Sequence, residues 1–377
     1  MRLVRLVVVM LATLALFTTG LAQEDAAYRA LRPDPVEPGA ELALLSPDGS
    51  HIAIIEDDGS TELCIREVET YPETFEGLCT DMRFDSKELQ GLEWSPDSTA
   101  LVFTSEPLLT GLDTDIWLAD ARTGDVTNLT DDGTDVFADA PMDVWPGWTP
   151  DGDVVFQRYD RDNGGEVVVS LMRLSRDGGE PEEIVRFPRT YATVMSGPAF
   201  VLDDGTIVLG TMPATGFTTG IFRVSPNGDF EHLADERVIA EEDSLVVLDV
   251  TDDGSTALVY GRASYESRFH AGAIALMDLD TGEIRRPGVL QDTPLVPATF
   301  SPDDRYVLSA AIGEDDRLRL VTTEVATSEQ SDIPFTDVDP DAGEAMWPHV
   351  SLTWAENDTV LLHTGVPTSV LIQLVTD

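Results

Sequence analysis

Short runs of apolar residues alternate with polar turns along most of the chain. One turn, Phe300-Ser301-Pro302-Asp303-Asp304, has related copies at residues 45–49, 94–98, 148–152, 202–205, 250–254 and 354–358. Successive copies are about 50 residues apart, a period that is typical of repeat architectures. The chain is therefore expected to fold as an array of one small unit.

The recurring turn has a local physical reason. Proline fixes φ at the first central position, an Asp or Asn side chain caps the turn, and glycine tolerates the left-handed backbone that follows. Apolar runs flank the turn, as at residues 91–94 and 100–104. Each such pair predicts a tight antiparallel hairpin. The tryptophans directly before three of the turns are expected to pack in the core: Trp94, Trp148 and Trp354.

Each unit continues into a third strand and a closing turn. Third strands are expected at residues 62–67, 115–119, 167–174, 220–224, 271–279, 317–323 and 370–375. Closing turns are expected at residues 123–124, 177–178, 227–228 and 281–282. Four strands per unit, repeated around an axis, are the layout of a β-propeller. One such sheet cannot bury both of its faces alone, so the sheets must stack on one another.

Counting the first turns predicts an all-β fold, a single β-propeller with seven four-stranded blades, and six blades are the alternative. The seventh unit has no outer strand of its own before Asp377. We expect the N-terminal lead, around residues 25–31, to supply that strand. This arrangement closes the ring without an open sheet edge.

Several segments resemble the repeat of TolB-like β-propellers, which are also called tryptophan-aspartate-like repeats. These segments are residues 94–97 (Trp-Ser-Pro-Asp), 101–105 (Leu-Val-Phe-Thr-Ser), 115–120 (Asp-Ile-Trp-Leu-Ala-Asp) and 127–130 (Thr-Asn-Leu-Thr). The resemblance covers essentially the whole chain after its first residues. It implies a propeller fold but no particular activity, because similar repeats occur in the periplasmic protein TolB and beside the hydrolase domain of prolyl-oligopeptidase-like enzymes.

Residues 1–22 have the pattern of a secretory signal peptide. Arg2 and Arg5 precede an apolar run that ends at Phe17, and small residues follow up to Ala22. The apolar run is too short to favour a spanning helix. We therefore expect a periplasmic or secreted protein with no stable membrane anchor, in which residues 23–40 form a lead and closing strand and residues 41–377 form the propeller.

The chain is strongly acidic, with a formal net charge of −47 at pH 7. Nucleic acid is not an expected partner, because binding it depends on basic side chains that displace counterions from phosphates. The acids are spread along the whole sequence. They fit the solvated surface of a secreted or salt-adapted protein, and the alternative is that they capture cations or attract a basic partner.

Two cysteines are present, Cys64 and Cys79. If the strand around Cys64 turns near residues 71–72 and runs back, the two positions face each other across a hairpin. In an oxidising compartment we expect them to form a disulfide. Two thiols alone cannot complete a structural zinc site.

The sequence carries no recognisable catalytic motif. It lacks a Gly-x-Ser-x-Gly elbow, a His-Glu-x-x-His pair, a phosphate loop and a dinucleotide-binding glycine pattern. Short, uniform turns are expected on one rim of the propeller, and longer, variable connections on the other. We call this second side the loop-rich rim, and we expect binding there because variable loops on a rigid scaffold usually carry function.

Aromatic and cationic residues expected near the loop-rich rim are candidates for binding a sugar or a peptide. They are Arg158, Arg189, Tyr191, Arg262, Tyr265, Arg268 and Trp347. Arginine can hold a carboxylate with two parallel hydrogen bonds. The alternative is that the arginines pair with the abundant acids and that the aromatic rings pack between blades.

No cofactor is expected, although two patterns leave a divalent cation open. His270, His349 and His363 are weak candidates for a metal site, which needs three or four convergent ligands. Residues 160–166 resemble part of a calcium loop, but the oxygen ligand that such a loop needs is missing at Gly164. Chance placement of the histidines and a solvated polar loop are the alternatives.

These observations favour an exported, non-catalytic propeller that binds an envelope or extracellular protein, a peptide or a glycan through its loop-rich rim. The competing class is an enzyme, a hydrolase or lyase, that acts on carbohydrate or peptide at the axial cavity. A structural component of an envelope complex is a third class. Polar side chains from several blades that converge in one pocket would favour the enzyme.

Overall fold

The computed structural model describes the backbone of most of the chain. The described residues are 28–36, 40–56, 62–68, 77–83, 91–104, 114–131, 141–162, 165–187, 197, 199–211, 220–235, 244–262, 271–285, 293–294, 298–312, 318–333, 350–364 and 369–376. Among them, all regular structure is β-strand. No described segment is a helix with the length and hydropathy that crossing a bilayer requires.

The described strands pair into seven sheets, which we number as blades in chain order. Blade 1 contains β2 (Ala40–Leu45), β3 (His51–Glu56), β4 (Glu62–Glu67) and β5 (Leu78–Arg83). Blade 2 contains β6 (Glu93–Trp94), β7 (Ala100–Thr104), β8 (Ile116–Asp120) and β9 (Val126–Asn128). Blade 3 contains β10 (Met142–Trp148), β11 (Val154–Arg161), β12 (Val167–Leu174) and β13 (Glu182–Arg186).

The remaining blades follow the same plan. Blade 4 contains β14 (Phe200–Val201), β15 (Ile207–Thr211), β16 (Gly220–Val224) and β17 (Phe230–Asp235). Blade 5 contains β18 (Ser244–Val250), β19 (Thr256–Arg262), β20 (Ala271–Asp278) and β21 (Ile284–Arg285), with β22 (Thr293–Pro294) also paired to β20. Blade 6 contains β23 (Ala298–Phe300), β24 (Tyr306–Ile312), β25 (Leu318–Glu324) and β26 (Gln330–Ile333). Blade 7 contains β27 (Val350–Trp354), β28 (Thr359–Thr364), β29 (Ser369–Thr376) and β1 (Tyr28–Val36).

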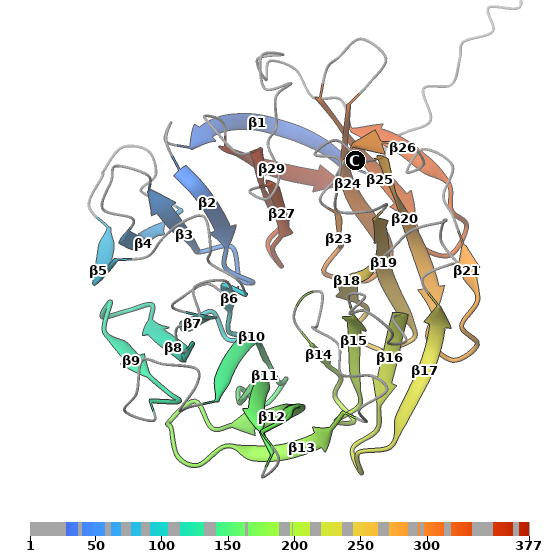
Figure 1. Cartoon of the computed structure of the whole chain (residues 1–377). Helices are drawn as coiled ribbons and strands as arrows, with labels where there is room; N and C mark the ends of the chain where they lie inside the picture. The colour runs from blue at the N-terminus through green and yellow to red at the C-terminus, as the bar shows by residue number, and fades with distance from the viewer. Residues whose placement is uncertain are drawn as a thin grey trace, which may run out of the picture.

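The blades form a ring around a central axis, with the first strand of each blade innermost (Figure 1). Within each blade the strands run antiparallel in sequence order, and only blade 7 takes its outer strand from elsewhere in the chain. The predicted all-β propeller of four-stranded blades is confirmed. The first-to-second and third-to-fourth turns lie on one side of the ring, which we call the short-turn rim.

The two ends of the described chain meet in blade 7. β1 pairs antiparallel with β29, from Tyr28 opposite Thr376 to Val36 opposite Ser369. The prediction of a closing N-terminal strand is therefore confirmed, but the strand extends to Val36 instead of ending near residue 31. Its two prolines are accommodated because an outermost strand needs only one hydrogen-bonded neighbour, and the register shifts between Ala30 and Pro33.

Each first turn is closed by the same backbone hydrogen bond, and in five of the seven blades the turn begins with a serine or threonine. In blade 6, the amide of Asp304 donates to the carbonyl of Ser301 at 2.8 Å. The hydroxyl of Ser301 donates to Asp303 Oδ1 at 2.7 Å and accepts from the amide of Tyr306 at 3.0 Å. In blade 2, burial alone would raise the pKa of Asp97, but hydrogen bonds from Ser95, Thr99 and Arg176 hold it below its usual range.

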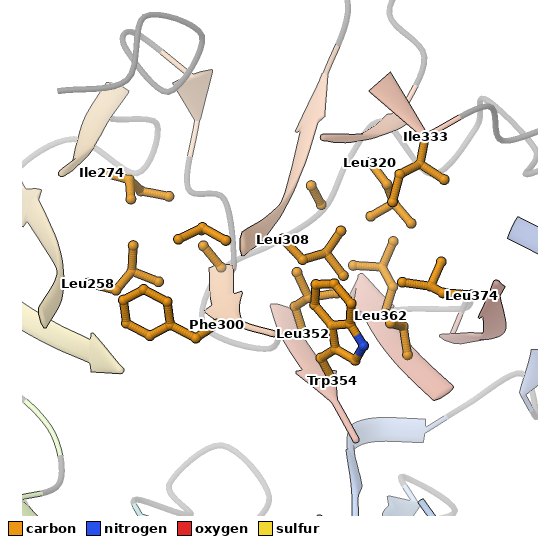
Figure 2. Close-up of a cluster of buried hydrophobic side chains, with 14 of the residues drawn as sticks. Leu258, Ile274, Phe300, Leu308, Leu320, Ile333, Leu352, Trp354, Leu362 and Leu374 are labelled. Atoms are coloured by element: carbon orange, nitrogen blue, oxygen red, sulfur yellow. The ribbon is translucent and has the colours of Figure 1, made fainter. Parts of the chain in front are cut away.

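Apolar side chains fill the spaces between neighbouring blades. Each cluster of buried residues draws on at least two blades, and the one in Figure 2 spans blades 5, 6 and 7 with Leu258, Phe300, Leu320 and Trp354 among its members. This packing meets the requirement that each blade bury both faces against its neighbours.

Tryptophans before the first turns join neighbouring blades. Trp94 and Trp148 are each 8% exposed. The indole Nε1 of Trp94 donates to the carbonyl of Leu44 in blade 1 at 3.2 Å, and that of Trp148 donates to the carbonyl of Glu93 in blade 2 at 3.2 Å. These side chains therefore combine apolar burial with a hydrogen bond between blades.

Cys64 and Cys79 form the predicted disulfide. The two residues are direct partners in the register of β4 and β5, and their Cα atoms are 4.0 Å apart. The bond fixes the outermost strand of blade 1 to the strand inside it. A disulfide is consistent with an oxidising compartment.

We expect Trp148→Ala to lower the free energy of unfolding by about 3–5 kcal/mol, because it removes a buried aromatic ring and leaves a cavity between blades 2 and 3. Trp148→Phe is the matched control, because it keeps most of the ring and loses only the indole donor, at about 1 kcal/mol. Urea denaturation followed by fluorescence measures both. A loss below about 1 kcal/mol for the alanine variant would contradict this role.

We expect the Cys64→Ala/Cys79→Ala double variant to be less stable than the oxidised native protein by about 3 kcal/mol, because the disulfide closes a short loop in the unfolded chain. A reductant should lower the urea midpoint of the native protein and leave that of the double variant unchanged. Thiol labelling of unfolded, unreduced protein should find no free cysteine, and two reactive thiols would overturn the assignment.

Candidate functional site

The predicted binding residues fall partly outside the described residues. Arg158 lies in β11, where both its backbone and its side chain are described. Arg262 is the last residue of β19. His363 lies in β28, opposite Ser351 and Ser369. The other predicted positions lie outside the described residues: Arg189, Tyr191, Tyr265, Arg268, His270, Trp347 and His349. Whether they converge at the loop-rich rim stays a prediction.

Arg158 forms an ion pair with a buried acid of the same blade. Its Nε and Nη2 atoms donate to Asp143 Oδ1 and Oδ2 at 2.7 and 2.6 Å. Asp143 is 1% exposed, and burial raises its pKa to about 6, although Arg158 and Thr130 act in the opposite direction. The guanidinium also lies 5.5 Å from the ring centre of Phe156. The Nε and Nη2 donors of Arg158 are thus already hydrogen-bonded within blade 3.

The calcium-like segment at residues 160–166 connects β11 to β12. The amide of Glu166 donates to Asp162 Oδ1 at 3.0 Å, and Nη1 of Arg161 donates to the carbonyl of Gly165 at 3.2 Å. Asp162 therefore caps the backbone of its own connection. Within the described part of the chain, no three His, Cys, Asp or Glu side chains are grouped so that they could hold a metal ion.

A cleft of about 640 Å³ opens on the short-turn rim between blades 4 and 5. It is walled by the first and closing turns of both blades, and its carboxylates come from Asp203, Asp204, Asp229, Glu231, Asp252, Asp253 and Asp280. Leu202, Phe230 and Leu279 supply an apolar part of the wall. The cleft lies on the side opposite to the loop-rich rim, where binding was predicted.

Arg223 is the one basic residue among those that line the cleft. Its Nε and Nη2 atoms donate to Glu231 Oε2 at 3.1 and 2.7 Å, and its Nη1 donates to the carbonyl of Leu279 at 3.1 Å. Nη1 also lies 3.7 Å from Asp280 Oδ1. Arg223 thus ties blade 4 to blade 5 and neutralises only part of the acidic wall.

Asp204 and Asp253, in the first turns of the cleft, stay ionised at neutral pH. A hydrogen bond from the backbone amide of Thr206 lowers the pKa of Asp204, and hydrogen bonds from the side chain and amide of Ser255 lower that of Asp253. The cleft therefore presents fixed negative charge beside apolar surface. Such a surface can accept a cationic group whose aliphatic stem packs on the apolar wall.

The shape of the cleft depends on Gly254. This residue has a φ of 67°, which favours glycine. A Cβ atom placed there would come within 2.5 Å of Leu202 Cδ1 in the neighbouring blade. Glycine thus lets the two turns approach each other.

Two acids take equivalent positions near the axis of the ring. Glu93 of β6 and Asp249 of β18 each stand two residues before the hydroxyl residue that begins a first turn. Burial, and then the charge of Asp249, raises the pKa of Glu93 to about 8. Burial also raises the pKa of Asp249, despite hydrogen bonds from Phe300, Thr299 and Val250. Carboxyl groups with raised pKa values are candidates for proton transfer.

The sequence analysis missed both the cleft and the axial acids. An alignment of the repeats could have found the axial acids. The position two residues before the start of each first turn holds an acid only in blades 2 and 5. The residues at that position are Leu44, Glu93, Gly147, Phe200, Asp249, Thr299 and Thr353. The cleft had no comparable signal, since acidic turns occur in every blade.

Comparisons with known proteins support the fold. No known family model matches the sequence, and no curated protein matches it. An oligogalacturonate lyase in complex with manganese superposes with a TM-score of 0.58 at 15% identity, over 93% of this chain and 98% of that chain. The oligogalacturonate lyase of Vibrio parahaemolyticus gives 0.56 at 13% identity, with the same coverage. A putative TolB from Agrobacterium tumefaciens gives 0.46 at 16% identity, over 66% of this chain and 80% of that chain.

These likenesses place the chain in the β-propeller class. TolB proteins are also among the structures that resemble it. At such low identities the similarity shows the fold alone, and activity must be argued from the residues of this chain.

We expect Glu93→Gln to make the protein more stable than native at pH 9. The folded pKa of Glu93 is raised to about 8 from 4.5, so its contribution to stability is present at low pH and is lost as the pH rises through 8. The amide carries no charge and removes this loss. Thermal midpoints from pH 5 to 9 measure the effect, and parallel profiles for native and variant proteins would refute it.

Proposed function

We propose that the protein is an exported, non-catalytic β-propeller that binds an envelope or extracellular protein or peptide. The observation that carries the proposal is the cleft between blades 4 and 5, where turns from two blades surround one volume with carboxylates and an apolar wall. Its charge selects a partner that presents an arginine or lysine side chain.

The ionisation of the cleft supports binding over acid-base chemistry. A general acid or base works best when its pKa is close to the operating pH. The pKa values of Asp204 and Asp253 are instead lowered by hydrogen bonds, so these groups neither store nor release protons near neutrality. They suit lasting electrostatic contact with a cation.

We also propose the loop-rich rim as a second contact surface, for a peptide or a glycan. The candidates are those given by the sequence: Arg158, Arg189, Tyr191, Arg262, Tyr265, Arg268 and Trp347. Export rests on the signal pattern of residues 1–22, and the Cys64–Cys79 disulfide agrees with a periplasmic or secreted location.

A propeller enzyme, a hydrolase or lyase acting on carbohydrate or peptide, is the second candidate. The axial acids favour it, because the pKa of Glu93, at about 8, lies close to neutral pH. Proteins with the same overall fold include oligogalacturonate lyases. Under this alternative Glu93 would hold or deliver a proton, and Glu93→Gln would abolish turnover of an oligosaccharide substrate.

The binding proposal is tested with fluorescent peptides that differ only in charge. We expect an arginine-containing peptide to bind, its glutamate counterpart not to bind, and the affinity to fall as salt rises. Asp204→Asn/Asp253→Asn should weaken binding about tenfold, which is about 1.4 kcal/mol.

The matched control is Asp120→Asn/Asp278→Asn, in the closing turns of blades 2 and 5. These acids also have lowered pKa values, and neither lines the cleft. Equal losses of binding in the two double variants would mean that overall charge, and not the cleft, attracts the peptide. No binding of either peptide would reject a cationic partner at this site.

A further inference from the structure

Blades 5 and 6 are joined by carboxylates that reach across in opposite directions. Asp249 Oδ2, in blade 5, accepts hydrogen bonds from the amide of Phe300 at 2.9 Å and the hydroxyl of Thr299 at 3.0 Å. Asp304 Oδ2, in blade 6, accepts from the amide of Asp252 at 2.8 Å. We call this reciprocal arrangement the carboxylate seam.

The local backbone places both acids of the seam. The register between β18 and β19 shifts between Val247 and Asp249, so Asp249 follows an irregularity that redirects the strand. Asp304 has a φ of 59° and occupies the left-handed position of its turn. Aspartate tolerates this conformation better than most residues do. The equivalent residue is a glycine in four other blades: Gly49, Gly152, Gly205 and Gly254.

The junction of blades 1 and 2 provides an uncharged counterpart. Ser98 occupies the same left-handed turn position as Asp304, with a φ of 57°. Its hydroxyl accepts a hydrogen bond from the amide of Asp48, in the first turn of the preceding blade, at 3.1 Å. A residue without a titratable group at this turn position can therefore also accept a hydrogen bond from a turn amide of the preceding blade. The use of aspartate in blade 6 adds charge to a contact that does not require it.

The surroundings of the seam are predominantly acidic. Glu93 faces Asp249 from β6, Asp252 and Asp253 stand in the first turn of blade 5, and Asp303 stands beside Asp304 in blade 6. The base in the same turn of blade 6, Arg305, has its guanidinium 5.4 Å from the ring centre of Tyr306.

This environment favours protonation. Burial raises the pKa of Asp304 to about 6, and the charges of Asp252, Asp249 and Asp253 add to the increase, although the hydrogen bond from Asp252 opposes it. Burial also raises the pKa of Asp249. The seam thus gains like charges as the pH rises, while its hydrogen-bond geometry needs only an acceptor oxygen.

We propose that the carboxylate seam is a pH-sensitive junction, which holds blades 5 and 6 firmly together in mild acid and loosens as the solution approaches neutral and alkaline pH. A protonated carboxyl keeps a carbonyl oxygen that can accept the amide hydrogen bond. Ionisation adds repulsion among Glu93, Asp249, Asp252 and Asp304, which are contributed by three blades.

The direction follows from proton linkage. Asp304 has a higher pKa in the folded protein than its ordinary value of 3.8, so the folded state holds a proton that the unfolded state has already released. Its stabilising contribution is complete below 3.8 and is lost as the pH rises through 6. Turn acids with lowered pKa values, such as Asp97, behave oppositely and lose their contribution in stronger acid.

Peptide-resolved hydrogen exchange at pH 5.0 and 7.5 tests the proposal, after correction for the intrinsic exchange rate. We expect peptides that cover residues 249–253 and 299–305 to be about tenfold better protected at the lower pH. Peptides from the first turns of blades 1 and 2, residues 46–50 and 95–99, serve as the internal reference and should change much less.

Asp304→Asn keeps an acceptor oxygen and removes the charge, and Asp304→Ser copies the contact of blade 2. Both variants should show protection at pH 7.5 close to that of the native protein at pH 5.0. Asp204→Asn removes one turn charge in blade 4 and should retain the native pH dependence.

The proposal is overturned if the seam and reference peptides of the native protein change equally with pH. It is also overturned if Asp204→Asn and Asp304→Asn reduce the pH dependence to the same extent, since overall charge would then be the cause. The native measurement decides the question even if a variant does not fold.

Discussion

The fold depends on apolar packing between sheets that cannot exist alone. Every buried cluster draws residues from neighbouring blades, so the stability of each blade is shared with the next. Side chains such as Trp94 and Trp148 reinforce this packing with a hydrogen bond to the carbonyl of the preceding blade. The ring is thus a closed series of similar contacts, and the rims are free to vary without disturbing it.

The formal net charge of −47 places a second constraint on the ring. Its many carboxylates must either be hydrogen-bonded and exposed or have their charge suppressed by protonation. First-turn acids such as Asp97 and Asp253 act as caps, and hydrogen bonds lower their pKa values. Near the axis the opposite holds, since burial makes the charge of Glu93 and Asp249 costly. The same residue type therefore serves as a fixed charge at the surface and as a titratable group inside.

The turn and its period were enough to predict the repeat, because proline, aspartate and glycine dictate local backbone geometry. The disulfide could be predicted from hairpin symmetry alone. The closing strand was expected around residues 25–31 but extends to Val36, since an outermost position accommodates Pro33 and Pro35. The seam could not be foreseen, because Asp249 reaches Phe300, and Asp304 reaches Asp252, only after two blades stack. The cleft was hidden by the abundance of acidic turns.

The pairing of β1 with β29 has a consequence for how the molecule is made. Tyr28 and Thr376 are neighbours in one ladder although nearly the whole chain separates them. Contacts between distant residues form slowly, because a large loop must close before they contribute. The outer strand β1 is therefore synthesised long before its partner β29, and blade 7 can form only once these two distant segments have met.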